Sequence, residues 1–116
     1  MINGAHVIIY SKDAEADRVF LRDVLKLTNV DVGGGWLIFG LPPAEVAVHP
    51  SEKNGVHELY LMCDDIQATV SELEAKGVEF TAPVSDEGFG LLTKMRVPGA
   101  GELGLYEPRH ATPLDL

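Results

Sequence analysis

The sequence predicts an α+β domain made of two copies of one βαβββ module. Two stretches, residues 5–13 and 56–64, carry the first sign of duplication. In each, a small or apolar residue precedes a histidine, an apolar run follows, and an aspartate lies seven positions after the histidine. The correspondence between the two copies continues to their ends, where Glu45 corresponds to Glu102. Such sustained repetition is typical of a duplicated structural unit.

This repeat divides the chain into four segments. Module one is expected at about residues 5–49, a polar linker at 50–55, module two at about 56–108 and a tail at 109–116. The chain has 116 residues, of which 46% are hydrophobic, and that is enough for a single core. We therefore expect residues 1–116 to fold as one domain.

The predicted elements of module one follow the order strand, helix, strand, strand, strand. The first strand is expected at residues 6–10, where β-branched side chains suit a buried pleated surface. A helix is expected at residues 13–26, because oxygen-bearing side chains precede apolar residues that recur every four positions. Residues 29–31 and 36–39 are expected to form strands around a glycine turn, and residues 45–49 to close the module.

Module two repeats this order. Its opening strand, after residue 56, leads to a helix at residues 65–76 that an aspartate caps and Gly77 ends. A long loop precedes the last two strands, and the strands after the helix are expected at residues 78–81, 91–97 and 102–107. The tail from Pro108 has few large apolar residues, so we expect it to be extended or frayed.

The formal net charge of −9 excludes some classes of partner. It repels phosphate backbones and anionic lipid surfaces, so neither nucleic acid nor a membrane is an expected partner. The apolar runs are too short to span a membrane, and the first residues lack the features of a signal peptide. These observations favour a soluble cytoplasmic protein. The single cysteine, Cys63, has no partner for an internal disulfide and is expected to be buried at a strand end.

The paired modules resemble those of the glyoxalase, bleomycin-resistance and extradiol dioxygenase superfamily, also called vicinal oxygen chelate. The resemblance covers roughly residues 5–108. It is carried by Gly55-Val56-His57, Asp64-Asp65-Ile66, the stretch from Lys76 to Phe80, and residues 98–106. It implies that each module curls into a half-barrel, and that two modules form a cup in which a metal ion or a ligand sits.

The same resemblance implies metal ligands at His6 and His57, which match the first-strand histidines of metal-binding members. The carboxylates that these members carry on their last strands fall at Ala47 and Gly104, and neither residue can bind a metal ion. A divalent ion needs three protein ligands or more. We therefore expect no tightly bound cofactor, and a divalent metal ion remains the alternative.

Three candidates for a third metal ligand lie one strand step away from the expected positions: His49, Glu45 and Glu102. A histidine that contacts a ligand or a neighbour, and an exposed carboxylate at the start of a strand, are the simpler interpretations. Tyr106 is a weak metal ligand and is better suited to donate a hydrogen bond in the cup. We therefore expect a ligand-binding cavity lined by His6, His49, His57 and Tyr106, and we assign no catalytic residue.

Two classes of function remain open. The first is a binding protein whose cup holds a small aromatic or cationic molecule without the usual full set of metal ligands. The alternative is a metal-dependent lyase, isomerase or dioxygenase, in which His6, His57 and a third ligand polarise substrate oxygens. The missing carboxylates favour the binding protein. Because an open half-barrel leaves strand edges that a second copy would cover, we also expect a homodimer.

Overall fold

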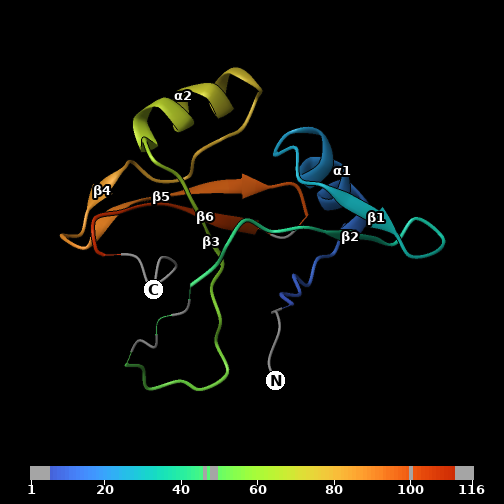
Figure 1. Ribbon diagram of the computed structural model, residues 1–116, viewed down its shortest axis with the longest axis horizontal. Helices are drawn as coiled ribbons and strands as arrows, with labels where there is room; N and C mark the ends of the chain where they lie inside the picture. Colours follow the sequence, from blue (N-terminus) through green and yellow to red (C-terminus); the bar gives the residue numbers. More distant parts are fainter. Residues whose placement is uncertain (1–5, 46, 48–49, 100, 112–116) are drawn as a thin grey trace.

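The computed structural model describes residues 6–45, 47, 50–99 and 101–111. Figure 1 shows β5 and β6 at its centre, α2 over one face of their sheet, and α1 beside the β1–β2 hairpin at the other end. The helices are α1 (Ala14–Asp23) and α2 (Ile66–Ala75). The strands are β1 (Asn29–Asp31), β2 (Leu37–Phe39), β3 (Tyr60–Met62), β4 (Ser85–Asp86), β5 (Gly90–Val97) and β6 (Gly101–Pro108). The predicted α+β class is confirmed.

Module two forms a mixed, open sheet with the strand order β3-β6-β5-β4. β3 runs parallel to β6 and pairs Tyr60 with Gly104, whereas β5 is antiparallel to both β6 and β4. The predicted strand at residues 78–81 lies beside β5, but it is reduced to one bridge, between Phe80 and Met95. β4 continues the same edge of the sheet inside the segment that was predicted to be a loop.

The core lies between this sheet and α2. Side chains alternate between the two faces of a strand, so alternate residues of β5 from Thr93 to Val97, and Leu103 and Leu105 of β6, are buried on the face toward the helix. The buried hydrophobic residues are Phe20, Ile66, Leu73, Val78, Met95, Val97, Leu103 and Leu105. Phe20 comes from α1, so the first half of the chain packs into the core of the second half.

Both helices begin and end at residues whose chemistry explains the boundary. Asp13 and Asp65 are caps rather than helical residues, because the Oδ1 atom of each accepts a hydrogen bond from the backbone N–H three residues later, at 3.1 Å. Gly77 follows the end of α2 with a φ of 87°, as its predicted role requires. α1 ends at Asp23, earlier than predicted, and the chain then turns through Lys26, which has a φ of 60°.

The first strand of module one is not formed, and this corrects the prediction for residues 6–10. Ile8 and Tyr10 are 63% and 87% exposed, and residues 6–10 pair with no other strand in the described part of the chain. β-branched residues favour a strand, but a strand also needs a neighbour to complete its hydrogen bonds. Module two pairs its first strand with its last, β3 with β6, but the corresponding last strand of module one, predicted at residues 45–49, lies mostly outside the described residues, and its two described members are not in a strand.

The β1–β2 hairpin of module one is confirmed. Its strands pair antiparallel, and the turn between them is closed by a hydrogen bond from the N–H of Trp36 to the carbonyl of Gly33, at 3.1 Å. The guanidinium of Arg18 lies over the ring of Trp36, 4.9 Å from its centroid, so the hairpin is held against α1.

A buried carboxylate joins α1 to module two. Asp17 is 6% exposed, and its Oδ1 atom accepts a 2.6 Å hydrogen bond from the N–H of Gly99, in the turn between β5 and β6. A Cβ atom at Gly99 would lie 2.5 Å from the Oγ atom of Ser11, so only glycine allows this approach. No helix within the described residues has the length and apolar character needed to cross a membrane.

Candidate functional site

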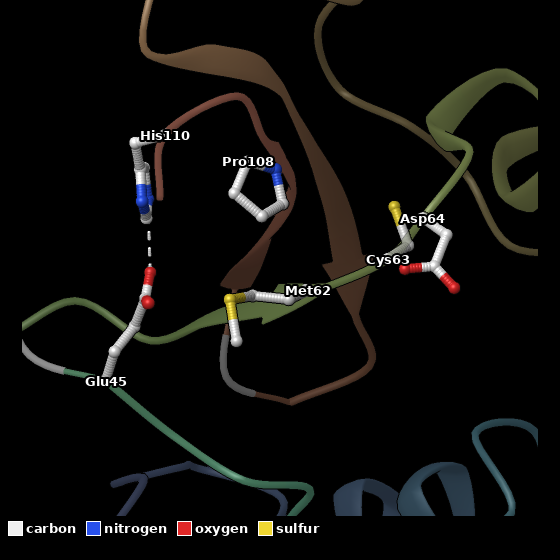
Figure 2. Close-up of a pocket in the computed structure, with 6 residues that line it drawn as sticks. All are labelled: Glu45, Met62, Cys63, Asp64, Pro108 and His110. Carbon is white, nitrogen blue, oxygen red and sulfur yellow. Dashed lines mark ion pairs between the residues drawn. The ribbon is translucent and has the colours of Figure 1, made fainter. Parts of the chain in front are cut away.

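A cavity of about 230 Å³ lies where three distant segments of the chain meet. We call it the tail pocket, because the tail supplies one of its walls. Glu45 comes from the segment after β2, Met62 from the end of β3, and Pro108 from the end of β6. The residues that line it are Glu45, Met62, Cys63, Asp64, Pro108 and His110. Figure 2 shows Glu45 and Asp64 at opposite ends of this group, with Met62 between them.

An ion pair between Glu45 and His110 closes one end of the tail pocket. The Nε2 atom of His110 lies 3.2 Å from the Oε1 atom of Glu45, as the dashed line in Figure 2 marks. The side chain of Glu45 is 19% exposed, which is low for a carboxylate and corrects its interpretation as an exposed residue at a strand start. The tail is therefore bound to the first half of the chain at residue 110, rather than frayed there.

Cys63 is held as a neutral thiol. Its backbone N–H and its thiol both donate hydrogen bonds to the carbonyl oxygen of Tyr106, with donor to acceptor distances of 2.9 Å from the nitrogen and 3.7 Å from Sγ. Burial raises the pKa of the Cys63 thiol, and the carboxylates of Glu107, Asp64 and Asp65 add to this, against a hydrogen bond with Thr69 that lowers it. Since the thiolate is the nucleophilic form, Cys63 is suited to contact a ligand rather than to attack one.

Three rings gather around that of Tyr106 beside the tail pocket. The ring centroids of Tyr60, Phe89 and His110 lie 6.4, 6.2 and 5.8 Å from that of Tyr106, which is the range of favourable aromatic pairs. The hydroxyl of Tyr106 donates a hydrogen bond to the carbonyl of Phe89, at 3.2 Å. Burial and the nearby charge of Glu45 raise the pKa of Tyr106, so it stays a neutral donor.

The position of Gly104, where metal-binding members carry a carboxylate, is covered by a neighbouring ring. A Cβ atom at Gly104 would overlap the ring of Tyr60, which is the partner of Gly104 in the parallel pair of β3 and β6. A carboxylate at this position would clash with the same ring. The geometry around Gly104 therefore does not fit the metal ligand that the family pattern implies there.

Of the residues that the sequence predicts to line one cavity, the structure describes three, and none of them is among the residues that line the tail pocket. His6 and His57 are both exposed, and neither lines the tail pocket. His49 lies outside the described residues. Tyr106 stacks on His110 at the edge of the pocket. Glu102, another candidate for a third metal ligand, accepts a hydrogen bond from Thr81.

Among the residues that the structure describes, no group of three His, Cys, Asp or Glu side chains is placed to hold a metal ion. The ligand-binding and metal-binding roles predicted for the histidines remain predictions. Sequence reasoning missed His110 as a site residue. The available signal was a histidine close after the last strand of module two, next to the aromatic Tyr106.

Comparisons with solved structures agree with the fold. A lactoylglutathione lyase from Agrobacterium tumefaciens superimposes with a TM-score of 0.65 at 16% identity, over 90% of this chain and 92% of that one. TnmS3, an antibiotic-binding protein from Streptomyces, gives a TM-score of 0.61 at 22% identity, over 93% of this chain and 99% of that one. At these identities the likeness shows the fold alone. None of the curated proteins matches this chain.

The family comparison extends over most of the sequence. Residues 5–108 match the family described as the Glyoxalase/Bleomycin resistance protein/Dioxygenase superfamily. The match covers both modules and ends where the tail begins. The chain therefore belongs to the glyoxalase, bleomycin-resistance and dioxygenase superfamily.

Proposed function

We propose that this chain binds a small aromatic or cationic molecule in the tail pocket and holds no metal ion tightly. The observation that carries this proposal is the pair of carboxylates, Glu45 and Asp64, at the two ends of a surface made by Met62, Cys63 and Pro108. Binding sites for small molecules combine an apolar lining with a few polar groups that fix orientation. Both of these side chains are carboxylates, which favours a ligand with a positive group.

The ring cluster around Tyr106 supports an aromatic ligand. Met62 and Tyr106 are partners in the parallel pair of β3 and β6, so the apolar surface of the pocket runs directly into the rings. Aromatic pairs contribute about 0.5–1.5 kcal/mol beyond the area that they bury. A flat molecule that lies on Met62 therefore gains an aromatic contact at the same time.

The size of the tail pocket limits its ligand. A volume of about 230 Å³ equals that of about eight water molecules at about 30 Å³ each. Pockets for drug-sized ligands measure about 300–1,000 Å³, so this one suits a small ring system or one part of a larger molecule. TnmS3, which has the same fold, is an antibiotic-binding protein, and this supports small-molecule binding as the class of function.

The positions of the residues that could bind a metal ion support the proposal that no metal is held tightly. His6 and His57 are exposed, and the position of Gly104 is covered by Tyr60. Two imidazoles alone bind a divalent ion weakly, since such sites need three protein ligands or more. A metal-dependent lyase, isomerase or dioxygenase stays the alternative, and its third ligand would be His49 or Glu102.

The exposed apolar segment at residues 7–10 supports the proposed homodimer. Val7, Ile8 and Tyr10 are 48%, 63% and 87% exposed. An extended apolar segment with unpaired backbone groups is a template for pairing with another chain. We propose that a second copy of the chain covers it. We place this function in the cytoplasm, where the lone thiol of Cys63 stays reduced.

Methionine methyl NMR tests the proposed binding site directly. The chain has three methionines, of which Met62 lines the tail pocket and Met95 is fully buried in the core. Three probes of similar shape and different charge are titrated: proflavine (cationic), acridone (neutral) and 9-anthracenecarboxylate (anionic). We expect proflavine to shift the Met62 methyl signal, assigned with a Met62→Leu variant, and to leave that of Met95 unchanged.

Two results would contradict the proposed function. If none of the three probes shifts Met62, the tail pocket is not the binding site. If elemental analysis finds a stoichiometric metal that survives dialysis and is lost in a His57→Ala variant, the metalloenzyme alternative holds.

A further inference from the structure

The tail pocket already contains a side chain that is positive when it is protonated, His110. The two nitrogens of the His110 ring both face oxygen acceptors: Nε2 lies 3.2 Å from Oε1 of Glu45, and Nδ1 lies 2.8 Å from the carbonyl oxygen of Ala111. A neutral imidazole carries one N–H and can donate to only one of them, whereas the imidazolium donates to both. A protonated His110 therefore satisfies both contacts, whereas the neutral ring satisfies one.

The ring of His110 also lies in the place that a ligand ring would use. Its centroid is 5.8 Å from that of Tyr106, and the two planes are inclined by 32°. One side chain thus makes both contacts that the pocket offers to an aromatic cation, a charge contact with Glu45 and a ring contact with Tyr106. The backbone around it is a short tail after β6, held by a hydrogen bond from the N–H of Arg109 to the carbonyl of Phe89.

We infer that His110 is an internal competitor that occupies the cation-binding end of the tail pocket, and that a cationic aromatic ligand binds by displacing it from Glu45. This inference rests on the proposed function, and it adds the role of Glu45 as the residue that receives the positive group of the ligand. It also assigns a regulatory role to the protonation of His110.

Glu45 is the ionic partner of His110, because the other charged groups nearby contact each other or lie farther away. Arg109 points to Asp86 and Glu107, with nitrogen to oxygen distances of 3.2 and 3.9 Å. Asp64 lies at the other end of the pocket, and Tyr106, which faces the ring, stays neutral. Competition by His110 therefore depends on the charges of His110 and Glu45.

The sign of the pH dependence follows from this pairing. The charge of a histidine side chain changes between about pH 5 and 8, and only a protonated His110 forms the competing ion pair with Glu45, so this ion pair weakens as pH rises. The affinity for a cationic ligand should then increase with pH. Because the ion pair between His110 and Glu45 is partly exposed, we expect this affinity to change about two- to fivefold.

Titration of proflavine at pH 6 and pH 8, followed through the Met62 methyl signal, tests the inference. We expect the wild-type Kd to fall about two- to fivefold between the two pH values. His110→Ala should bind as tightly at pH 6 as at pH 8, since the competitor is gone. Glu45→Gln should bind more weakly at both values and show no pH dependence. Glu74→Gln removes an exposed carboxylate from α2 and should behave as the wild type.

The failures of the two proposals are distinguishable. If proflavine does not shift Met62 at either pH, the proposed function fails. If it shifts Met62 but the wild-type Kd is the same at both pH values, or if His110→Ala keeps the pH dependence, His110 is not the competitor. Acridone serves as the neutral probe, and an equal pH dependence for acridone would also overturn the role of charge.

Discussion

The ring of Tyr60 covers Gly104 on the neighbouring strand, where the two residues are direct partners of the parallel pair of β3 and β6. The glycine leaves a gap in the face of the sheet, and the ring fills it. This pairing resembles the way in which aromatic residues stabilise glycines in designed sheets. It also places Tyr60 in contact with Tyr106, whose centroid lies 6.4 Å away.

Substitution of Gly104 should therefore destabilise the domain. Gly104→Ala forces a methyl group into the ring of Tyr60, and we expect a loss of about 1–3 kcal/mol in the free energy of unfolding, measured by urea denaturation. The double variant Gly104→Ala with Tyr60→Ala should recover part of what the single variants lose together. Strict additivity of the two losses would show that the ring and the glycine do not interact.

Removal of the buried carboxylate of Asp17 should weaken the joint between α1 and module two. Asp17→Ala deprives the N–H of Gly99 of its acceptor, and a buried donor left unpaired costs about 1–3 kcal/mol. Glu15→Ala, at an exposed position in the same turn of α1, serves as the control and should have little effect. Equal stabilities for the two variants, by thermal or urea unfolding, would contradict this role of Asp17.

A charge in the exposed N-terminal segment should disrupt the proposed homodimer. Ile8→Lys places an ammonium group where we expect a second copy to bind, so the variant should be monomeric at tens of micromolar by light scattering, whereas the wild type should be dimeric. Val19→Lys, at a position 42% exposed on α1, provides a matched control that should stay dimeric. A monomeric wild-type protein would contradict the proposed homodimer.

The raised pKa of Cys63 predicts slow alkylation. Because burial favours the neutral thiol, less thiolate is present at any given pH than in the unfolded chain, and iodoacetamide should react more slowly with the folded protein. The same shift means that the folded state keeps its proton longer, so the free energy of unfolding should fall as pH rises above about 8.5. A folded thiol that reacts as fast as the unfolded one would contradict the burial of Cys63.

The helix and the last two strands of module two follow the prediction closely because local signals define them. Asp65 caps α2, Gly77 ends it, and the turn after Val97 sets the pairing of β5 with β6. Each signal acts within a few residues, so it can be recognised without knowledge of the tertiary structure. The sequence also places the family and the α+β class correctly.

The first strand could not be predicted in the same way. Residues 6–10 have strand propensity, but pairing depends on a neighbour that the sequence does not specify. The tail pocket was missed for a similar reason, since Glu45, Met62 and His110 come from three separate segments. Their proximity depends on the packing of the tail against module one, and no local pattern encodes that contact.

The most direct test of the account is the affinity of proflavine for a chain without the two pocket carboxylates. In the double variant Glu45→Gln with Asp64→Asn, we predict a Kd at pH 8 at least about tenfold higher than in the wild type, which corresponds to about 1.4 kcal/mol. The Met62 methyl signal reports binding, and that of Met95 reports the integrity of the core. An unchanged Kd, with Met95 unperturbed in the double variant, would contradict the proposal that the tail pocket binds a cation.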